Sequence, residues 1–311
     1  DETELGLSAA RDPAPPPAPG RSRFTLRDTP EEYLAEIAAC RREIFEGETY
    51  EVCLTTELRS DGTVDPLAAY RTLRARNPAP FAVLLRLGDV SVLSSSPERF
   101  LRVDRERVVE SRPMKGTAAR AAEPIADAVR AAELRRDEKT RAENLMIADL
   151  VRNDLGRVAR LGTVEVPRLM VVESHATVHQ MITVVRAKLR DGADALDCVR
   201  AAFPAGSMTG APKLRTLEII DRLEQRARGV YSGALGFLAV NGTADLNVVI
   251  RTLVASPSGL TIGSGGAIVA ASDPRDELDE MLLKARALLA AVGGTVETSG
   301  KVALAARVPG D

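Results

Sequence analysis

The residues with the clearest capacity for chemistry surround a lysine in the segment 111–117, which reads SRPMKGT. Lysine is uncommon in this chain, because six of the 42 basic residues are Lys and the rest are Arg. Gly116 allows a ligand to approach the backbone, and Thr117 with the neighbouring N–H groups can bind an anion. Residue types alone leave Lys115 two roles: a cation that pairs with an anion or, if desolvated, an amine nucleophile.

Carboxylates form a second candidate group. Glu138, Glu143 and Asp149 fall in one expected helix. Glu277 and Glu280 lie three residues apart in another, so they share a helix face. Mg²⁺ prefers such hard oxygen ligands and binds through one or two carboxylates together with an anionic substrate. A solvated, charged helix face is the alternative interpretation.

Two glycine-rich turns, GSMTGAPK at 206–213 and GSGGA at 263–267, can present backbone N–H groups to a small carboxylate. The first is not a phosphate-binding loop, because no Ser or Thr follows Lys213. The two histidines of the chain, His175 and His179, have a spacing that can ligate zinc on a helix. This segment is β-like and lacks the glutamate of an HExxH motif, so a hydrogen-bonded or substrate-facing histidine is the favoured interpretation.

The elements that must position these residues begin with a helix. Thr29, Pro30 and Glu32 supply an N-cap, a first-turn proline and a capping-box glutamate for a helix that ends near Glu46. Four short β runs within 81–110 are too close for crossover helices, which predicts antiparallel pairing. The other expected elements are strands at 50–58, 163–173, 177–189, 230–240, 244–255 and 260–271, the last three as a meander, and helices from 65 and 212 and at 123–160, 193–202 and 273–292.

Composition and charge exclude several classes of protein. The formal net charge is −2, and 45% of the residues are hydrophobic without an apolar run as long as a membrane-spanning helix. We therefore expect a soluble globular protein with no nucleic-acid groove and no membrane segment. Three cysteines without CxxC spacing exclude a disulfide framework or a zinc ribbon and fit a reducing, cytoplasmic compartment.

The expected organisation is one folded domain with short extensions. Residues 12–20 read DPAPPPAPG, so 1–22 are assigned as an acidic leader and a Pro-rich linker. Residues 23–300 form the folded domain, and 301–311 form a tail. The order of elements does not alternate as in a parallel βαβ fold, and it favours an α+β protein with two antiparallel sheets covered by helices.

Five motifs occur in the order found in one enzyme family. They are SPERF (96–100), PMKGT (113–117), RAENLMIADLVRNDLG (141–156), GSMTGAPK (206–213) and VIRT (249–252). From about Thr29 to Val292 the chain thereby resembles the chorismate-utilising enzymes. This resemblance implies a four-layer α/β/β/α sandwich of two large antiparallel sheets, with 23–300 as the chorismate-binding catalytic domain. The further N-terminal stretch of the family is expected to be missing upstream of Arg21.

Single residues indicate a branch of this family. Lys115 stands where anthranilate synthases usually have Ala, and Asn144 stands where they commonly have His, so both resemble component I of the aminodeoxychorismate synthases. Glu51 stands where isochorismate and salicylate synthases use a lysine to activate water, which disfavours attack by water. The alternatives within the family are an anthranilate, isochorismate or salicylate synthase. The alternative from another class is a non-catalytic chorismate-binding or regulatory module.

The resemblance also implies roles for residues. Lys115 would add to C2 of chorismate while Glu98, the general acid, protonates the departing C4 hydroxyl. Ammonia would then enter at C4 and expel the lysine, giving 4-amino-4-deoxychorismate towards para-aminobenzoate. Glu143 and Glu280 match Mg²⁺ ligands, with Glu277 as a supporting or additional ligand. The implied substrate-contacting residues are Gly116, Thr117, His179, Thr209, Tyr231, Arg251, Gly265 and Lys284.

The chain lacks the cysteine motif of a glutaminase and departs from the family pattern at two alanines. No cysteine lies in a Gly-x-Cys-x-Gly turn typical of a glutaminase, so a glutamine amidotransferase subunit or fused domain is implied as the partner. Ala267 stands where the family usually has Gly, and Ala271 stands where Asp is common. The methyl group of Ala267 would lie near a carboxylate of the substrate.

Overall fold

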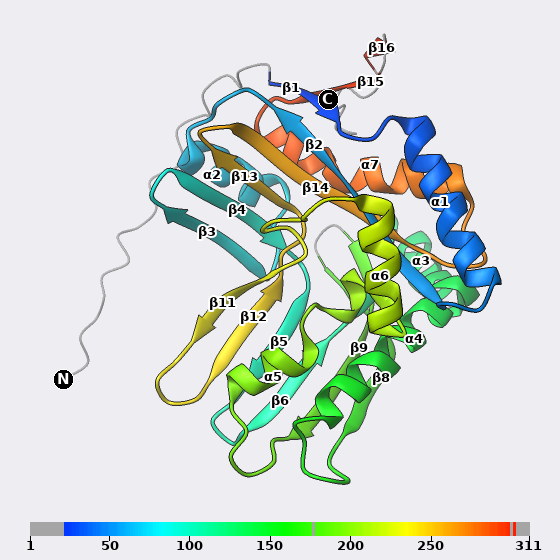
Figure 1. Ribbon diagram of the computed structural model, residues 1–311, viewed down its shortest axis with the longest axis vertical. Helices are drawn as coiled ribbons and strands as arrows, with labels where there is room; N and C mark the ends of the chain where they lie inside the picture. The colour runs from blue at the N-terminus through cyan, green and yellow to red at the C-terminus, as the bar shows by residue number, and fades with distance from the viewer. Residues whose placement is uncertain (1–21, 176–177, 299–300, 303–311) are drawn as a thin grey trace.

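The computed structural model describes residues 22–175, 178–298 and 301–302. The expected leader and linker lie outside the described residues, apart from Ser22. Lys301–Val302 (β16) pair with Thr295–Thr298 (β15), so the first residues of the expected tail extend a sheet. The strands form two large sheets set at an angle to each other, with helices packed against both (Figure 1). This arrangement confirms the expected α+β class and the two-sheet architecture of the family.

The larger sheet has nine strands in the order β16-β15-β1-β2-β14-β13-β4-β3, and β10 also pairs with β2. Most neighbours are antiparallel, but β1 and β15 run parallel, so the sheet is mixed rather than wholly antiparallel as expected. The parallel pair is possible because β15 follows a long helix, and such a connection can return the chain in either direction. The bounds are β1 Arg23–Leu26, β2 Glu51–Ser60, β3 Phe81–Leu87, β4 Val90–Ser96, β10 Gly210–Ala211, β13 Thr252–Ser256 and β14 Gly259–Ile268.

The smaller sheet has seven strands in the order β11-β12-β5-β6-β9-β7, and β8 also pairs with β9. Its pairs are antiparallel, as expected. The bounds are β5 Arg99–Val103, β6 Val108–Arg112, β7 Met114–Ala119, β8 Glu165–Ser174, β9 Val178–Lys188, β11 Ala234–Leu238 and β12 Ala244–Val248.

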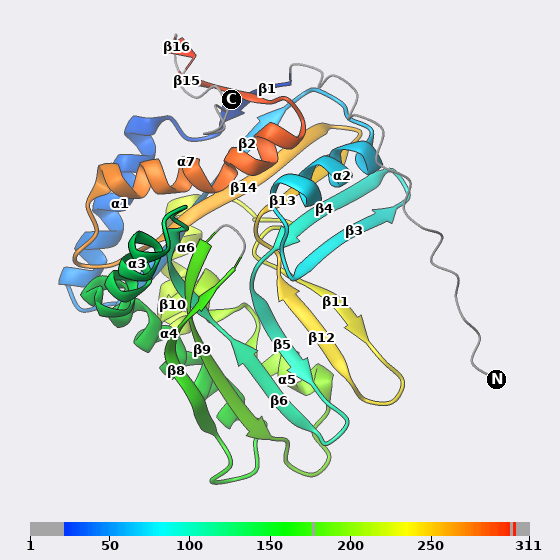
Figure 2. The ribbon, with the colours of Figure 1, turned by 180° about the vertical axis from the view of Figure 1, so that it is seen from behind.

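Helices cover both sheets (Figure 2). The larger sheet packs against α1 (Pro30–Phe45), α2 (Pro66–Arg76), α6 (Lys213–Glu224) and α7 (Pro274–Ala291) through two buried clusters. The smaller sheet packs against α3 (Pro124–Arg136), α4 (Glu138–Gly156) and α5 (Ala195–Ala202). A single helix over 123–160 was expected, but it is divided at Asp137. The carboxylate of Asp137 accepts from the N–H of Thr140 at 2.7 Å and so starts a new helix.

Two crossovers carry the chain from one sheet to the other, side by side. The expected strand 244–255 is wrong, because β12 ends in the smaller sheet at Val248 and β13 begins in the larger sheet at Thr252. The expected three-strand meander is therefore also wrong. β4 and β5 are separated in the same way, around Glu98. The crossovers are joined, since the Val248 N–H donates to the Glu98 carbonyl at 3.1 Å and the Ser95 N–H donates to the Arg251 carbonyl at 3.0 Å.

Candidate active site

One cavity lies at the junction of the two sheets and brings together most of the residues that the sequence singled out. Its lining includes the expected Glu98, Lys115, Gly116, Thr117, Glu143, Tyr231, Arg251, Gly265, Glu277, Glu280 and Lys284. His179 and Thr209 are not among the lining residues. The lining also contains residues that the sequence analysis did not select, among them Cys53, Lys139, Gln180 and Ser207. Five motifs spread over the chain thus converge on a single site.

Glu98 enters this cavity from the first crossover and is 5% exposed. Burial raises the pKa of its carboxyl group to about 7, although the nearby Ser207 hydroxyl and Lys115 ammonium act against this shift. A substantial fraction of Glu98 is therefore protonated at neutral pH. A buried carboxylic acid of this kind can donate a proton to a leaving group.

Arg251 enters from the second crossover, where its backbone has the left-handed φ of 50°. Its Nη1 donates to the carbonyl of Lys284 at 3.0 Å, which fixes the guanidinium in the wall of the cavity. Burial lowers the pKa of Arg251, but an arginine remains charged under all ordinary conditions. The planar guanidinium suits the binding of a substrate carboxylate.

Lys115, on β7, is paired with a second buried charge. Its Nζ donates to Oε1 of Glu51 at 2.6 Å, and Glu51 on β2 is 0% exposed. Burial alone lowers the pKa of Lys115, but the carboxylates of Glu51 and Glu143 outweigh it and hold the pKa well above its ordinary value. Without substrate, Lys115 is therefore an ammonium ion.

Gly116 and its neighbours form a polar wall next to this lysine. Gly116 has a φ of 74°, and a Cβ there would lie 2.2 Å from Cγ2 of Thr140, so any other residue would strain the backbone and displace Thr140. The Thr117 hydroxyl donates to Oε1 of Gln180 at 2.9 Å, and Nε2 of Gln180 donates to the Gly116 carbonyl at 2.6 Å. Gln180 was missed by the sequence analysis, which selected the residue before it. Adjacent side chains of a strand point to opposite faces, and in β9 the cavity receives Gln180.

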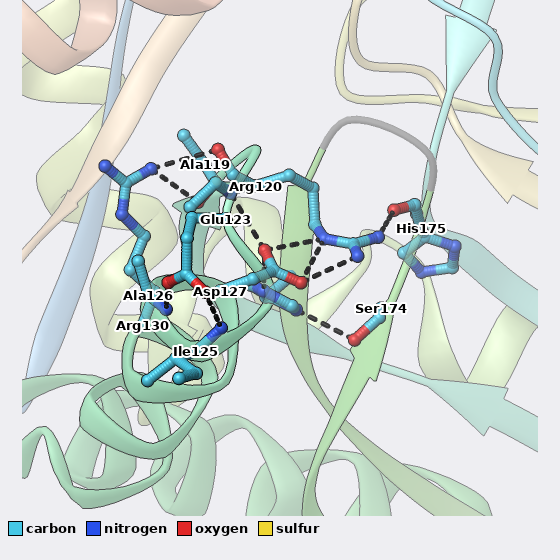
Figure 3. Close-up of polar contacts among 11 residues, drawn as sticks. Ala119, Arg120, Glu123, Ile125, Ala126, Asp127, Arg130, Ser174 and His175 are labelled. Atoms are coloured by element: carbon cyan, nitrogen blue, oxygen red, sulfur yellow. Dashed lines mark hydrogen bonds and ion pairs between the residues drawn. The ribbon is translucent and has the colours of Figure 1, made fainter.

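His179 is occupied elsewhere, at the junction of β9 and α3. Its Nε2 lies 2.9 Å from Oδ1 of Asp127, and the Ser174 hydroxyl lies 2.8 Å from its Nδ1. Figure 3 shows Asp127 held in turn by Arg120, whose Nη1 also donates to the carbonyl of His175 at 2.6 Å. The hydrogen-bonded interpretation of His179 therefore agrees with its contacts, and the substrate-facing one does not. Within the described residues, no group of three or more His, Cys, Asp or Glu is placed to hold a metal ion.

Of the two selected residues of the glycine-rich turns, Gly265 lines the cavity and Thr209 does not. The Thr209 hydroxyl donates to the carbonyls of Ala205 and Gly206 at 3.3 and 3.2 Å, so it stabilises its own turn rather than facing the cavity. Gly265 lines the cavity from β14, and a Cβ there would lie 2.2 Å from the Leu54 carbonyl oxygen of the paired strand. Nζ of Lys284 donates to the carbonyl of Gly265 at 2.9 Å.

Three carboxylates of α4 and α7 face the same cavity. Burial raises the pKa of Glu143 to about 7, despite the partly opposing charge of Lys115. Nζ of Lys139 donates to Oε1 of Glu277 at 2.7 Å and lies 3.9 Å from Oε1 of Glu143, beyond hydrogen-bond length. Glu280 pairs with Lys284 at 2.8 Å. Glu277 and Glu280 thus each have a lysine at hydrogen-bond distance, whereas the lysine paired with Glu143 is 3.9 Å away.

The fold and the converging motifs agree with one family. The chain belongs to the chorismate binding enzymes, and the family match covers residues 2–290. It is similar to aminodeoxychorismate synthase of Streptomyces pristinaespiralis, with 57% identity over 260 residues that make up 84% of this chain and 36% of that protein. It is also similar to anthranilate synthase component 1 of Streptomyces coelicolor, with 42% identity over 280 residues, 90% of this chain and 55% of that protein.

A solved structure shows the same architecture. Anthranilate synthase component I from Streptococcus pneumoniae superposes with a TM-score of 0.79 at 31% identity, covering 86% of this chain and 60% of that one. The chain therefore spans less than two thirds of the length of these relatives. Among the helices of the described residues, none is long and apolar enough to cross a membrane.

Proposed function

We propose that this chain converts chorismate and ammonia to 4-amino-4-deoxychorismate, towards para-aminobenzoate, through a covalent intermediate on Lys115. The observation that carries the proposal is that an amine, Lys115, and a protonatable acid, Glu98, line one cavity. The high identity with an enzyme named aminodeoxychorismate synthase supports this choice within the family. The chain has free, buried cysteines, which support a reducing compartment such as the cytoplasm.

The reaction divides between these two residues. The amine of Lys115 forms a bond to C2 of the ring, both ring double bonds shift by one position, and the C4–O bond breaks. Glu98 supplies the proton with which the hydroxyl departs as water. Ammonia then bonds to C4, and the C2–N bond to Lys115 breaks to release the 4-amino product. Two displacements place the new amine at C4 rather than at C2.

We assign the binding of the substrate to other residues that line the cavity. We assign Arg251 to one carboxylate of chorismate, because its guanidinium is fixed by Lys284 and can form a bidentate pair. Thr117 and Gln180 offer polar atoms beside Lys115, and Gln180 replaces His179 in our set of substrate-contacting residues. Tyr231, Gly265 and Lys284 complete the set, and Thr209 supports its turn.

The carboxylates fit a magnesium ion. Glu143 and Glu280 offer carboxylate oxygens on the cavity wall, and Glu143 is a buried carboxylate whose ion pair with Lys139, at 3.9 Å, is too long for a hydrogen bond. Two carboxylates together with an anionic substrate match the way proteins hold Mg²⁺. Glu280 pairs with Lys284 and Glu277 with Lys139, and the more deeply buried Glu277 is assigned a supporting place. When bound, the ion would neutralise a carboxylate of the substrate.

The test is product analysis with the chain, chorismate, Mg²⁺ and an ammonium salt. We expect 4-amino-4-deoxychorismate and, before ammonia is added, a mass adduct on Lys115. Lys115→Gln, which keeps a hydrogen-bond acceptor and donor beside Glu51, should lower the rate at least about 100-fold, or about 2.7 kcal/mol in barrier height. Lys213→Gln is the matched control, since Lys213 forms another buried pair, with Asp154 at 2.6 Å.

Two results would contradict the proposal. An active enzyme whose Lys115 carries no adduct would remove the covalent step. A 2-amino product from the unchanged chain would assign it to the anthranilate branch instead.

A further inference from the structure

We propose that Glu51 is the positioning residue that takes the proton of Lys115 and thereby converts its ammonium into the amine that attacks chorismate. The inference rests on the proposed function, in which Lys115 is the nucleophile. It adds a role that the reaction requires, because an ammonium ion has no lone pair with which to form a bond.

The geometry of β2 brings this carboxylate to the lysine. Val52 and Leu54 point to the helix-covered face of the larger sheet, where they join a buried cluster. Glu51 and Cys53 alternate with them and point toward the junction of the sheets. Cys53 reaches the cavity, and Glu51 lies behind Lys115 without lining the cavity. Glu51 therefore acts on the substrate only through Lys115.

The contacts of Glu51 fit a proton acceptor. Its Oε1 lies 2.6 Å from Nζ of Lys115, within the reach that a general base needs. Its Oε2 is buried and has no hydrogen-bond partner within the described part of the chain. Lys115 is thus the hydrogen-bond partner of this carboxylate. Among the described residues, no donor contacts the second oxygen to stabilise the negative charge of Glu51.

The surroundings make proton transfer inside this pair the favoured route. The groups that face Lys115 are Glu51 and Cys53 of β2, Glu98 of the first crossover, Glu143 of α4 and Glu280 of α7. Of these, Glu51 is the group whose hydrogen bond to Nζ is seen. Transfer along this bond neutralises two buried charges together, whereas loss of the proton to solvent would leave the Glu51 charge buried and unpaired.

The step balances. The ammonium of Lys115 gives one proton to the Glu51 carboxylate, and the resulting amine forms the C2–N bond as the C4–O bond breaks with the proton of Glu98. The lysine nitrogen then carries a positive charge as a secondary ammonium. When ammonia displaces it, Lys115 leaves as an amine and recovers its proton from Glu51. The ion pair seen in the structure is thereby restored.

The experiment measures adduct formation with chorismate in the absence of ammonia, by rapid quenching and intact-protein mass spectrometry, between about pH 6 and pH 9. Rates of each variant are divided by those of the unchanged chain at the same pH, so that the titration of Glu98 cancels. For Glu51→Gln we expect a rate about 100-fold lower at pH 7, the size of a general-base contribution. The ratio should rise about tenfold per pH unit, because hydroxide must then remove the proton.

Two further variants complete the design. Glu51→Asp keeps a carboxylate, so its ratio should be lower than one but independent of pH. Asp154→Asn removes the carboxylate of a different buried lysine pair, which does not line the cavity of Lys115, and its ratio should stay near one.

The inference is overturned if the E51Q ratio is one or more at every pH, since Glu51 would then merely hold Lys115 charged. The inference is also overturned if the rate ratio of the E51Q variant does not depend on pH. Should the E51Q protein fail to fold, a pH-dependent ratio for the E51D variant overturns it, and a constant one supports it. Absence of any adduct in the unchanged chain contradicts the proposed function instead.

Discussion

The protonation state of Glu98 is the residue-scale property on which the first half of the proposed reaction depends. Its pKa is raised to about 7, and the acid form is the active one, so adduct formation without ammonia should decrease as pH rises through about 7. Glu98→Gln should lose at least about 100-fold in rate at low pH and no longer show this decrease. Ser207→Ala should move the midpoint to higher pH, because the Ser207 hydroxyl lowers the pKa of Glu98.

The same rapid-quench measurement checks this prediction. A rate that stays level between about pH 6 and pH 9 in the unchanged chain would show that another group donates the proton. A midpoint that Ser207→Ala leaves in place would remove Ser207 from the cause of the shift.

Residue types were predictable from the sequence, but directions of side chains were not. Lys115, Glu98 and Glu143 were found because rare or charged residues stood in ordered motifs, and all three line the cavity. His179 was selected in place of Gln180 because the family resemblance implied a substrate contact at that position. Which neighbour faces the cavity depends on the phase of β9 against β7, and this register is set by pairing with residues far away in the sequence.

At the scale of the element, α1 carries a carboxylate that opposes folding. Glu36 is half-buried, its Oε2 has no hydrogen-bond partner in the described residues, and burial with the nearby Asp28 and Glu224 raises its pKa to about 7. A raised carboxyl pKa means that the charged form is destabilising, so the penalty is absent below about pH 4.5 and complete above about pH 7. Glu36→Gln should therefore stabilise the protein by about 1 kcal/mol at pH 8, after allowance for solvent screening, and by much less at pH 5.

Denaturant unfolding at the two pH values tests this expectation. The matched control is Glu31→Gln, an exposed glutamate in the first turn of the same helix, where a carboxylate is favourable, so this change should not stabilise the protein at either pH. An equal gain at pH 5 and pH 8 would assign the effect to something other than the Glu36 charge.

Helices and strands were predicted well where they depend on residues close together in the sequence. They were predicted poorly where they depend on pairing with distant residues. The capping residues Thr29 and Glu32 defined α1 correctly, since both of their hydrogen bonds form within one turn. The strand expected at 244–255 failed because its two halves have the same β pattern but belong to different sheets. Nothing in a local pattern records which sheet a strand joins, and this is decided by pairing with β5 on one side and β4 on the other.

At the scale of the whole molecule, the proposed function requires that nitrogen arrive as ammonia. All three cysteines are buried and free, and burial raises the pKa of the Cys198 thiol to about 12, so it stays uncharged and unreactive. We expect the purified chain to form aminated product from an ammonium salt but not from glutamine. Adding a glutamine amidotransferase should confer the use of glutamine.

Glutamate release and aminated product are measured together, with the ammonium salt as the positive control. If the chain alone releases glutamate in step with the product, it contains an amidase site that neither its sequence nor its described residues reveal.

The paired crossovers also determine when, during folding, the substrate cavity can form. The hydroxyl of Ser96 donates to the carbonyl of Val248 across 152 positions of sequence, and this contact joins the two loops that carry Glu98 and Arg251. Contacts of such separation form late, because loop closure over so many residues has a high entropic cost. An intermediate in which one sheet has formed would contain native strands but would lack the substrate cavity. Ligand binding should therefore reappear in the last phase of refolding.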